Sequence, residues 1–393
     1  MPRYFESSPL SLGIHLTPEE EFLSLSISHK TALNHKRLVD LYHQLGDQYA
    51  FLLSERNSIT CIVAQSLIWS NLSLGSSWLD RLASNESLIS EFMSELDSVA
   101  ELFAVHDIPL IALKNSGIAR GIYPNYGCSP MGDLDVLIPQ DNFIQAHNLL
   151  IENEFQFIYR SQHEIASLDY ALETGGSEYR KILPSGSVLW FELQCRSVSG
   201  RWIRPHQEPK SEELFSRSLK VQGSHVRILS PVDNLIQVCL HTAKHSYVRS
   251  PGFRLHTDVD RIVRGCTIDW HLFLKRVNSL NVRTATFFSL IFASDLLGTP
   301  VPQSVLRSLR PNILKLHVIR LWLMKVGLFE PNSPKWNRFT FPVFVGLLYD
   351  NFASLFASLF PSKDWLRRRF RSSFFPLNYL RYIINILFVR SMT

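Results

Sequence analysis

The sequence predicts an α+β protein in which a mixed β-sheet domain is flanked by N-terminal and C-terminal helical regions. Up to about residue 105, apolar residues recur at the three- and four-residue spacing of amphipathic helices. Between residues 106 and 230, short apolar runs bounded by turn residues replace that spacing and indicate buried strands. Helical spacing returns from residue 231 onward. We therefore expect three parts, comprising residues 1–105, 106–230 and 231–393.

Composition excludes several classes of protein. Hydrophobic residues make up 46% and charged residues 19% of the 393 residues, which excludes a disordered or fibrous chain. The net charge is only +5, and residues 361–393 hold seven basic residues against one acid. The rest of the chain is therefore close to neutral, and we do not expect it to bind long nucleic acid.

Cysteine usage and the N-terminus favour a cytoplasmic protein. The five cysteines are far apart and form no CxxC pair, so neither a disulfide framework nor a zinc ribbon is expected. The first residues lack the charged and apolar segments of a secretory signal.

The N-terminal region begins with a recognisable helix start. Thr17 has the character of an N-cap, and Pro18 and three glutamates follow it. Further helices are expected at 37–56 and 88–106, with a loop rich in Ser, Asn and Gly at 71–77.

The middle region contains the predicted strands, joined by a helical connection at 141–154. The expected strands are 108–113, 134–138 and 155–159, followed by hairpins of 179–183 with 188–193 and of 219–222 with 225–229.

The C-terminal region again follows helical spacing. Helices are expected at 232–244, 257–263, 269–280 and 284–297. The apolar stretch 339–360 contains Pro342, Asp350 and Asn351, so we interpret it as a buried or surface helix and not as a membrane span.

The tail combines basic and apolar residues at 365–371 and 379–389. Two interpretations stay open. The tail could contact an anionic membrane surface peripherally, or it could be a solvated basic face packed on the helical domain.

Two aspartates at the start of a predicted strand form the clearest chemical motif. Asp133 and Asp135 alternate with Leu134 and Val136, so both carboxylates lie on one face. Like charges this close are costly unless a cation lies between them. A hard divalent ion such as Mg²⁺, with a substrate phosphate as further ligand, would resolve the conflict.

The segment after the strand at 108–113 indicates an anion site. Asn115, Ser116 and Gly117 lie between this strand and a helix, where exposed backbone N–H groups can bind phosphate. Lys114 and Arg120 stand nearby as charge partners for that phosphate.

A third acid lies within an apolar strand. Burying the charged carboxylate of Glu192 in this strand costs free energy unless it is paired with a cation or coordinates a metal. We therefore expect Glu192 to face the site of the two aspartates. A buried ion pair with Arg180 or Arg196 is the alternative.

These motifs resemble the uncharacterised bacterial nucleotidyltransferases of the DNA polymerase β-like superfamily. The resemblance covers about 110–305 and is carried by residues 113–123 and 130–138, the later acid, and segments 228–245, 258–262 and 297–302. It implies a minimal nucleotidyltransferase domain in which Asp133, Asp135 and Glu192 bind Mg²⁺ (or Mn²⁺) and act in catalysis.

The resemblance also implies the reaction: transfer of a nucleotidyl group from a nucleoside triphosphate to a hydroxyl of a small-molecule, saccharide or protein acceptor. The family usually has Lys-Gly where this chain has Lys114-Asn115, and Arg where it has Ser129. Arg120 or Lys181 could replace that arginine in binding the triphosphate. A catalytically impaired nucleotide- or ligand-binding module that keeps the fold is the alternative.

Two histidines share one helix face. His241 and His245 have zinc-ligand spacing, but no third ligand is evident. We prefer a core or site-facing role for His241, with Asp258 as a candidate partner.

Overall fold

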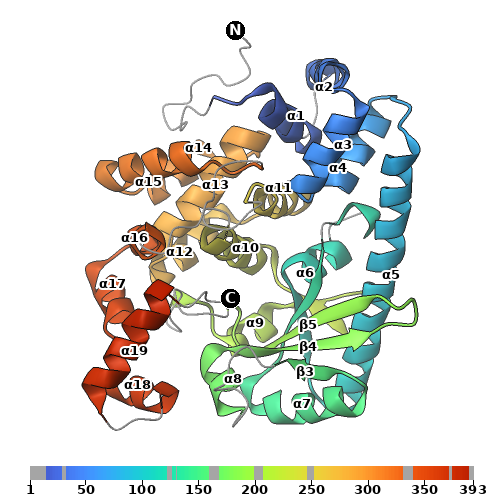
Figure 1. The fold of residues 1–393 in the computed structure, drawn as a ribbon. Coiled ribbons are helices and arrows are strands. Elements are labelled where there is room, and N and C mark those ends of the chain that lie inside the picture. The colour runs from blue at the N-terminus through green and yellow to red at the C-terminus, as the bar shows by residue number, and fades with distance from the viewer. Residues whose placement is uncertain are drawn as a thin grey trace.

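In a computed structural model, helical segments precede and follow a β-sheet region along the chain (Figure 1). The α+β class predicted from the sequence is confirmed. The structure describes residues 15–28, 32–121, 126–129, 131–158, 168–198, 207–245, 252–330, 340–370 and 374–388.

The N-terminal helices begin with the predicted cap. Thr17 accepts a hydrogen bond from the backbone N–H of Glu20, whose side chain accepts one from the backbone N–H of Thr17. The single helix expected at 37–56 is wrong, because Gly46 adopts φ +79° and separates two helices. The helices are α1 (Pro18–Ile27), α2 (Ala32–Leu45), α3 (Asp47–Arg56), α4 (Thr60–Trp69) and α5 (Ser76–Val105).

Within the described residues, the sheet has seven strands in the order β3-β4-β5-β2-β1-β7-β6. It is mixed, because β1 pairs with β7 and β2 with β5 in parallel while the other neighbours are antiparallel. Both predicted hairpins are confirmed, as β4–β5 and β6–β7. The strands are β1 (Leu110–Leu113), β2 (Asp133–Leu137), β3 (Gln156–Ile158), β4 (Gly176–Ile182), β5 (Val188–Gln194), β6 (Leu219–Lys220) and β7 (Val226–Ile228).

Helices cover the sheet unequally. Ile89 and Phe103 of α5 and Phe143 of α7 share a core with Val136 and Phe191 of the strands. The other face of β1 and β2 packs in part against α9. The sequence did not predict α8 and α9, which are too short to show a period. The connecting helices are α6 (Lys114–Gly121), η1 (Tyr126–Cys128), η2 (Gln140–Asn142), α7 (Phe143–Glu152), α8 (Asp169–Thr174) and α9 (Ser211–Arg217).

The C-terminal helices confirm the four predicted between 232 and 297. The described part of the apolar stretch, residues 340–360, forms two helices. They are separated at Asp350, which accepts hydrogen bonds from the backbone of Arg283 and Thr284, and at Asn351, which caps the second helix. In the described part of the chain, no helix is long and apolar enough to cross a membrane. The helices are α10 (Pro231–His245), α11 (Leu255–Gly265), α12 (Trp270–Leu280), α13 (Arg283–Leu297), α14 (Gln303–Leu309), α15 (Ile313–Val326), α16 (Thr340–Leu348), α17 (Phe352–Leu359), α18 (Lys363–Phe370) and α19 (Phe375–Phe388).

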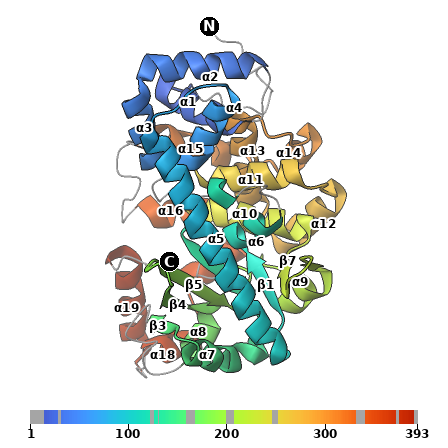
Figure 2. The ribbon, with the colours of Figure 1, turned by 90° about the vertical axis from the view of Figure 1, so that its right-hand side faces the viewer.

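The two helical regions meet in one hydrophobic core. Phe22 and Leu67 from the N-terminal helices belong to the same buried cluster as Leu235 and Phe288 from the C-terminal helices. We call this assembly the helical lobe and the sheet with its covering helices the sheet lobe. Helix α5 runs along both lobes (Figure 2). The predicted acids Asp135 and Glu192 lie where the lobes meet, since Lys114 contacts both of them and also Gln237 of α10.

Candidate active site

Strand register brings the predicted acids together. Asp135 of β2 is the direct partner of Glu192 of β5, so both side chains lie on the same face of the sheet. Asp133 lies two residues earlier on that face and is exposed, whereas Asp135 is buried. Glu178 of β4 pairs in turn with Glu192 and adds a fourth acid to this face. The sequence could not reveal Glu178, because its position depends on the register of two strands.

Lys114 lies between the acids. Its Nζ atom is 2.5 Å from Oδ1 of Asp135 and 3.3 Å from Oε2 of Glu192. The residue follows β1 and begins α6 with φ +49°, and its backbone N–H donates to Oε1 of Gln237 at 3.3 Å. The sequence predicted Lys114 as a phosphate contact, but the structure uses its ammonium group to neutralise the acids.

Burial dominates the electrostatics of this cluster. It raises the pKa of Asp135 well above its ordinary value; Lys114 opposes this shift, and Asp133 and Glu192 add to it. Burial alone would lower the pKa of Lys114, but the three carboxylates raise it above its ordinary value. One ammonium group therefore faces several carboxylates at this site.

The Ser-Gly turn positions Asp135. The Ser116 hydroxyl is fully buried and accepts a hydrogen bond from the backbone N–H of Asp135 at 3.0 Å. A Cβ on Gly117 would lie 2.6 Å from the carbonyl oxygen of Ala112, so glycine lets α6 approach β1 closely. Gln194 donates from Nε2 to Oδ1 of Asp135 at 3.0 Å. Ser116 and Gly117 therefore serve the sheet and its aspartate, whereas the sequence predicted that they bind phosphate.

Asn115 and Asp258 form a contact of their own. With its amide nitrogen turned toward the carboxylate, Asn115 donates to both oxygens of Asp258 at 3.1 and 3.0 Å. Burial raises the pKa of Asp258 to about 7, and the charges of Arg254 and Arg261 oppose the shift. The partner that the structure gives Asp258 is thus Asn115, where the sequence suggested His241.

His241 does face the site. It lines a small cavity together with Lys114, Gln237 and Lys244. Burial, together with the positive charges of Lys114, Lys244 and Arg254, lowers the pKa of His241 well below its ordinary value, so the ring is neutral at neutral pH. Its ring centroid lies 4.8 Å from that of His245.

Two predicted phosphate ligands lie elsewhere. Arg120 binds the carboxylate of Asp97 and, at 3.0 Å, the carbonyl oxygen of Met93. Lys181 donates to Glu95 at 2.7 Å. Asp97, Met93 and Glu95 all belong to α5, which packs on the face of the sheet opposite the acids. Neither cation is placed to replace the arginine that is absent at Ser129.

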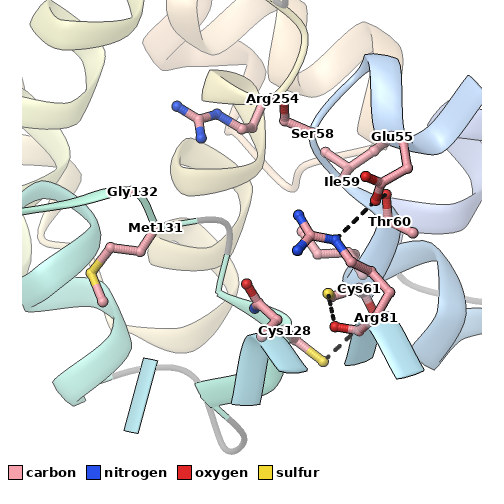
Figure 3. A pocket seen from close by; sticks show the side chains of 12 residues that line it. Glu55, Ser58, Ile59, Thr60, Cys61, Arg81, Cys128, Met131, Gly132 and Arg254 are labelled. Atoms are coloured by element: carbon pink, nitrogen blue, oxygen red, sulfur yellow. Dashed lines mark hydrogen bonds and ion pairs between the residues drawn. The ribbon is translucent and has the colours of Figure 1, made fainter. Parts of the chain in front are cut away.

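A pocket of about 200 Å³ lies between the N-terminal helices and Met131 and Gly132, the residues that precede β2 (Figure 3). Gly132, the neighbour of Asp133, forms one wall, and Arg81 and Glu55 form another, joined by a 3.0 Å contact from Nε to Oε1. Among the described residues, the two Nη atoms of Arg81 have no hydrogen-bond partner. The remaining lining residues are Ser58, Ile59, Thr60, Cys61, Ile62, Asn85, Cys128, Met131 and Arg254.

The acids suit a hard cation by their chemistry. Carboxylate oxygens on one face are the donors that Mg²⁺ prefers. Among the described residues, however, no three His, Cys, Asp or Glu side chains lie close enough together to hold a metal ion. A metal would therefore require Lys114 to withdraw from Asp135 and Glu192.

The fold and site define a class: a mixed-sheet α+β protein with an Asp-x-Asp pair and a third acid on one face of the sheet. Residues 47–298 match a family described as uncharacterised nucleotidyltransferases. The chain belongs to this nucleotidyltransferase family, which makes it a transferase at the coarse level. No curated protein and no solved structure matches the chain.

Proposed function

We propose that the protein transfers a nucleotidyl group from a nucleoside triphosphate to an acceptor hydroxyl, with Mg²⁺ or Mn²⁺ as cofactor, in the manner of DNA polymerase β-like enzymes. The observation that carries the proposal is the pairing of Asp135 with Glu192 on one face of the sheet, next to Asp133. The positive groups of Lys244 and Arg254 lie close enough to His241 to shift its pKa. Such cations provide partners for a triphosphate beside the acids.

Asp133, Asp135 and Glu192 would hold the metal, which when bound neutralises charge on the α-phosphate and the departing pyrophosphate. Lys114 would then release the acids and bind phosphate, the role predicted from the sequence. The long, flexible stem of lysine allows this exchange without movement of the backbone.

The chemical step involves one bond made and one broken. The acceptor oxygen attacks the α-phosphorus, and the bond from that phosphorus to the oxygen bridging toward the β-phosphate breaks. Pyrophosphate leaves with the bridging oxygen and the electron pair. Glu192 accepts the proton of the acceptor hydroxyl as general base.

The pocket beside Gly132 is our proposed acceptor site. Its walls carry hydroxyl, amide and charged groups of Ser58, Thr60, Asn85 and Arg81, and its volume of about 200 Å³ suits a small polar molecule or a terminal saccharide. The Nη atoms of Arg81 could bind an anionic group of that acceptor. This favours a small acceptor over a protein or a long nucleic acid.

The test is a set of melting curves with each nucleoside triphosphate, with and without Mg²⁺, followed by transfer of α-phosphate label to candidate acceptors. We expect nucleotide to raise the melting temperature of the parent only when Mg²⁺ is present. Asp135→Asn should abolish the shift. Asp97→Asn removes a carboxylate of α5 that pairs with Arg120 of α6, and this variant should retain the shift in melting temperature.

A second candidate is a nucleotide- or ligand-binding module without catalysis. The position of Lys114 favours it, because the ammonium group already neutralises the acids without a metal. An equal nucleotide shift with and without Mg²⁺, and no label transfer, would support the module and contradict the enzyme.

A further inference from the structure

Helices α17 and α19 lie at one side of the molecule (Figure 1). Several of their large apolar side chains are exposed. Phe352 is 76% and Leu380 53% exposed. Exposed apolar patches of this kind mark interaction sites. We call this surface the C-terminal apolar face; it consists of Phe352, Phe356, Phe360, Phe375, Leu380 and Ile384.

The C-terminal apolar face is continuous across the two helices. Ring centroids are 6.3 Å apart from Phe352 to Phe356, 4.5 Å from Phe356 to Phe360, and 5.7 Å from Phe360 to Tyr379. Tyr379 is 6.1 Å from Phe375. The rings thus form one connected row from α17 to α19.

Helix α19 exposes a large part of its apolar surface, although Tyr382 packs against Leu366 and Phe370 of α18. Leu380, Ile383 and Ile384 are exposed, whereas the polar residue Asn378 is only 1% exposed. An ordinary surface helix buries its apolar stripe and exposes its polar one. The sequence of α19 therefore suits an environment outside the protein that is itself apolar.

Positive charge surrounds the same face. Nζ of Lys363 lies 5.4 Å from the ring centroid of Phe375, and Arg367 and Arg381 are exposed on α18 and α19. Residues 361–393 contain seven basic residues and one acid. A second copy of the chain would bring the same positive charges against this face, whereas anionic lipid headgroups would complement them.

We propose that the C-terminal apolar face binds the surface of an anionic lipid bilayer. Its aromatic rings and aliphatic side chains would enter the boundary between headgroups and acyl chains, and Lys363, Arg367 and Arg381 would contact the headgroups. The contact is with the membrane surface, since the described helices are too short or too polar to cross a bilayer.

The test is flotation of the full chain with vesicles of phosphatidylcholine alone or mixed with phosphatidylglycerol. We expect the protein to float with the anionic vesicles only, and less at high salt. Replacing Lys363, Arg367 and Arg381 together by Gln should weaken partitioning about a hundredfold. The double variant Phe356→Glu, Leu380→Glu should abolish it.

The matched control is Val105→Glu, which adds an acid at a 77% exposed apolar residue at the end of α5. Unchanged melting temperatures show that each variant is folded. Equal flotation with neutral and anionic vesicles, or flotation with neither, overturns the proposal. A lipid-free dimer that Phe356→Glu, Leu380→Glu dissociates, without vesicle binding, would instead assign the face to a second copy.

Discussion

The ammonium group of Lys114 lies 2.5 Å from Oδ1 of Asp135, and both side chains are largely buried. The pair lets a sheet carry adjacent acids without an external cation. The same contact places a competitor where a divalent ion would bind. The charge balance of the folded protein therefore depends on whether Lys114 or a metal occupies this position.

Lys114→Met removes this charge and keeps most of the side-chain length. Without metal, the free energy of unfolding should fall by about 3–5 kcal/mol, because buried carboxylates lose their partner. Added Mg²⁺ should then stabilise the variant more than the parent. Melting curves at several Mg²⁺ concentrations measure both effects.

Lys181→Met is the control, because Lys181 pairs with Glu95 outside the site. It should cost less stability and leave the Mg²⁺ response unchanged. An equal Mg²⁺ response in the parent and both variants would show that Lys114 and the metal do not compete.

Glu192→Gln tests the proposed general base. Loss of a general base lowers the rate by about a hundredfold or more. The rate of label transfer should fall by this factor. The limb of the pH–rate profile that reflects ionisation of the general base should also be lost. Glu178→Gln, which changes the neighbouring acid across the strands, should have a smaller effect. Equal losses in the two variants would argue against Glu192 as the base.

Gly117→Ala tests the packing of α6 on β1. A methyl group 2.6 Å from the carbonyl oxygen of Ala112 forces the two elements apart, so we expect a loss of about 1–3 kcal/mol in unfolding free energy. Gly132→Ala is the control, because no atom lies within 4 Å of its added Cβ. Chemical denaturation measures both, and similar values for the two variants would contradict the close contact.

The sequence predicted the parts of the fold that depend on local patterns. Alternating residues in β2 placed Asp133 and Asp135 on one face, and the acid in β5 was expected beside them. Contacts between residues that are far apart in the sequence could not be predicted from these local patterns. Lys181 is three residues from Glu178 on the same strand and therefore points to the opposite face of the sheet. There it contacts Glu95 of α5, a partner that only the three-dimensional arrangement reveals.

The same limit applies to Lys114 and to the lobes. A lysine beside a predicted phosphate turn is compatible with a phosphate contact, and only the packing of β1 against β2 reveals its contact with Asp135. Likewise, the common core of Phe22 and Phe288 joins segments about 260 residues apart in the chain. Helical periodicity reports which face is buried and not which distant helix covers it.

Asp258 makes the stability of the fold depend on pH, because burial raises its pKa to about 7. In the unfolded chain an aspartate has a pKa near 3.9. Between about pH 4 and pH 7, the folded state therefore keeps a proton that the unfolded state has lost. The contribution of this group to stability is largest at the acidic end and falls as the pH rises, by a few kcal/mol in total. Above about pH 7 the contribution becomes constant, because both states are ionised.

Asp258→Asn removes this titration. Urea denaturation of the parent and the variant between pH 4 and pH 8 should show a shallower decline for the variant, and the difference between the two curves should level off above pH 7. A constant difference between parent and Asp258→Asn at every pH would mean that Asp258 is ionised throughout, with Arg254 and Arg261 outweighing its burial.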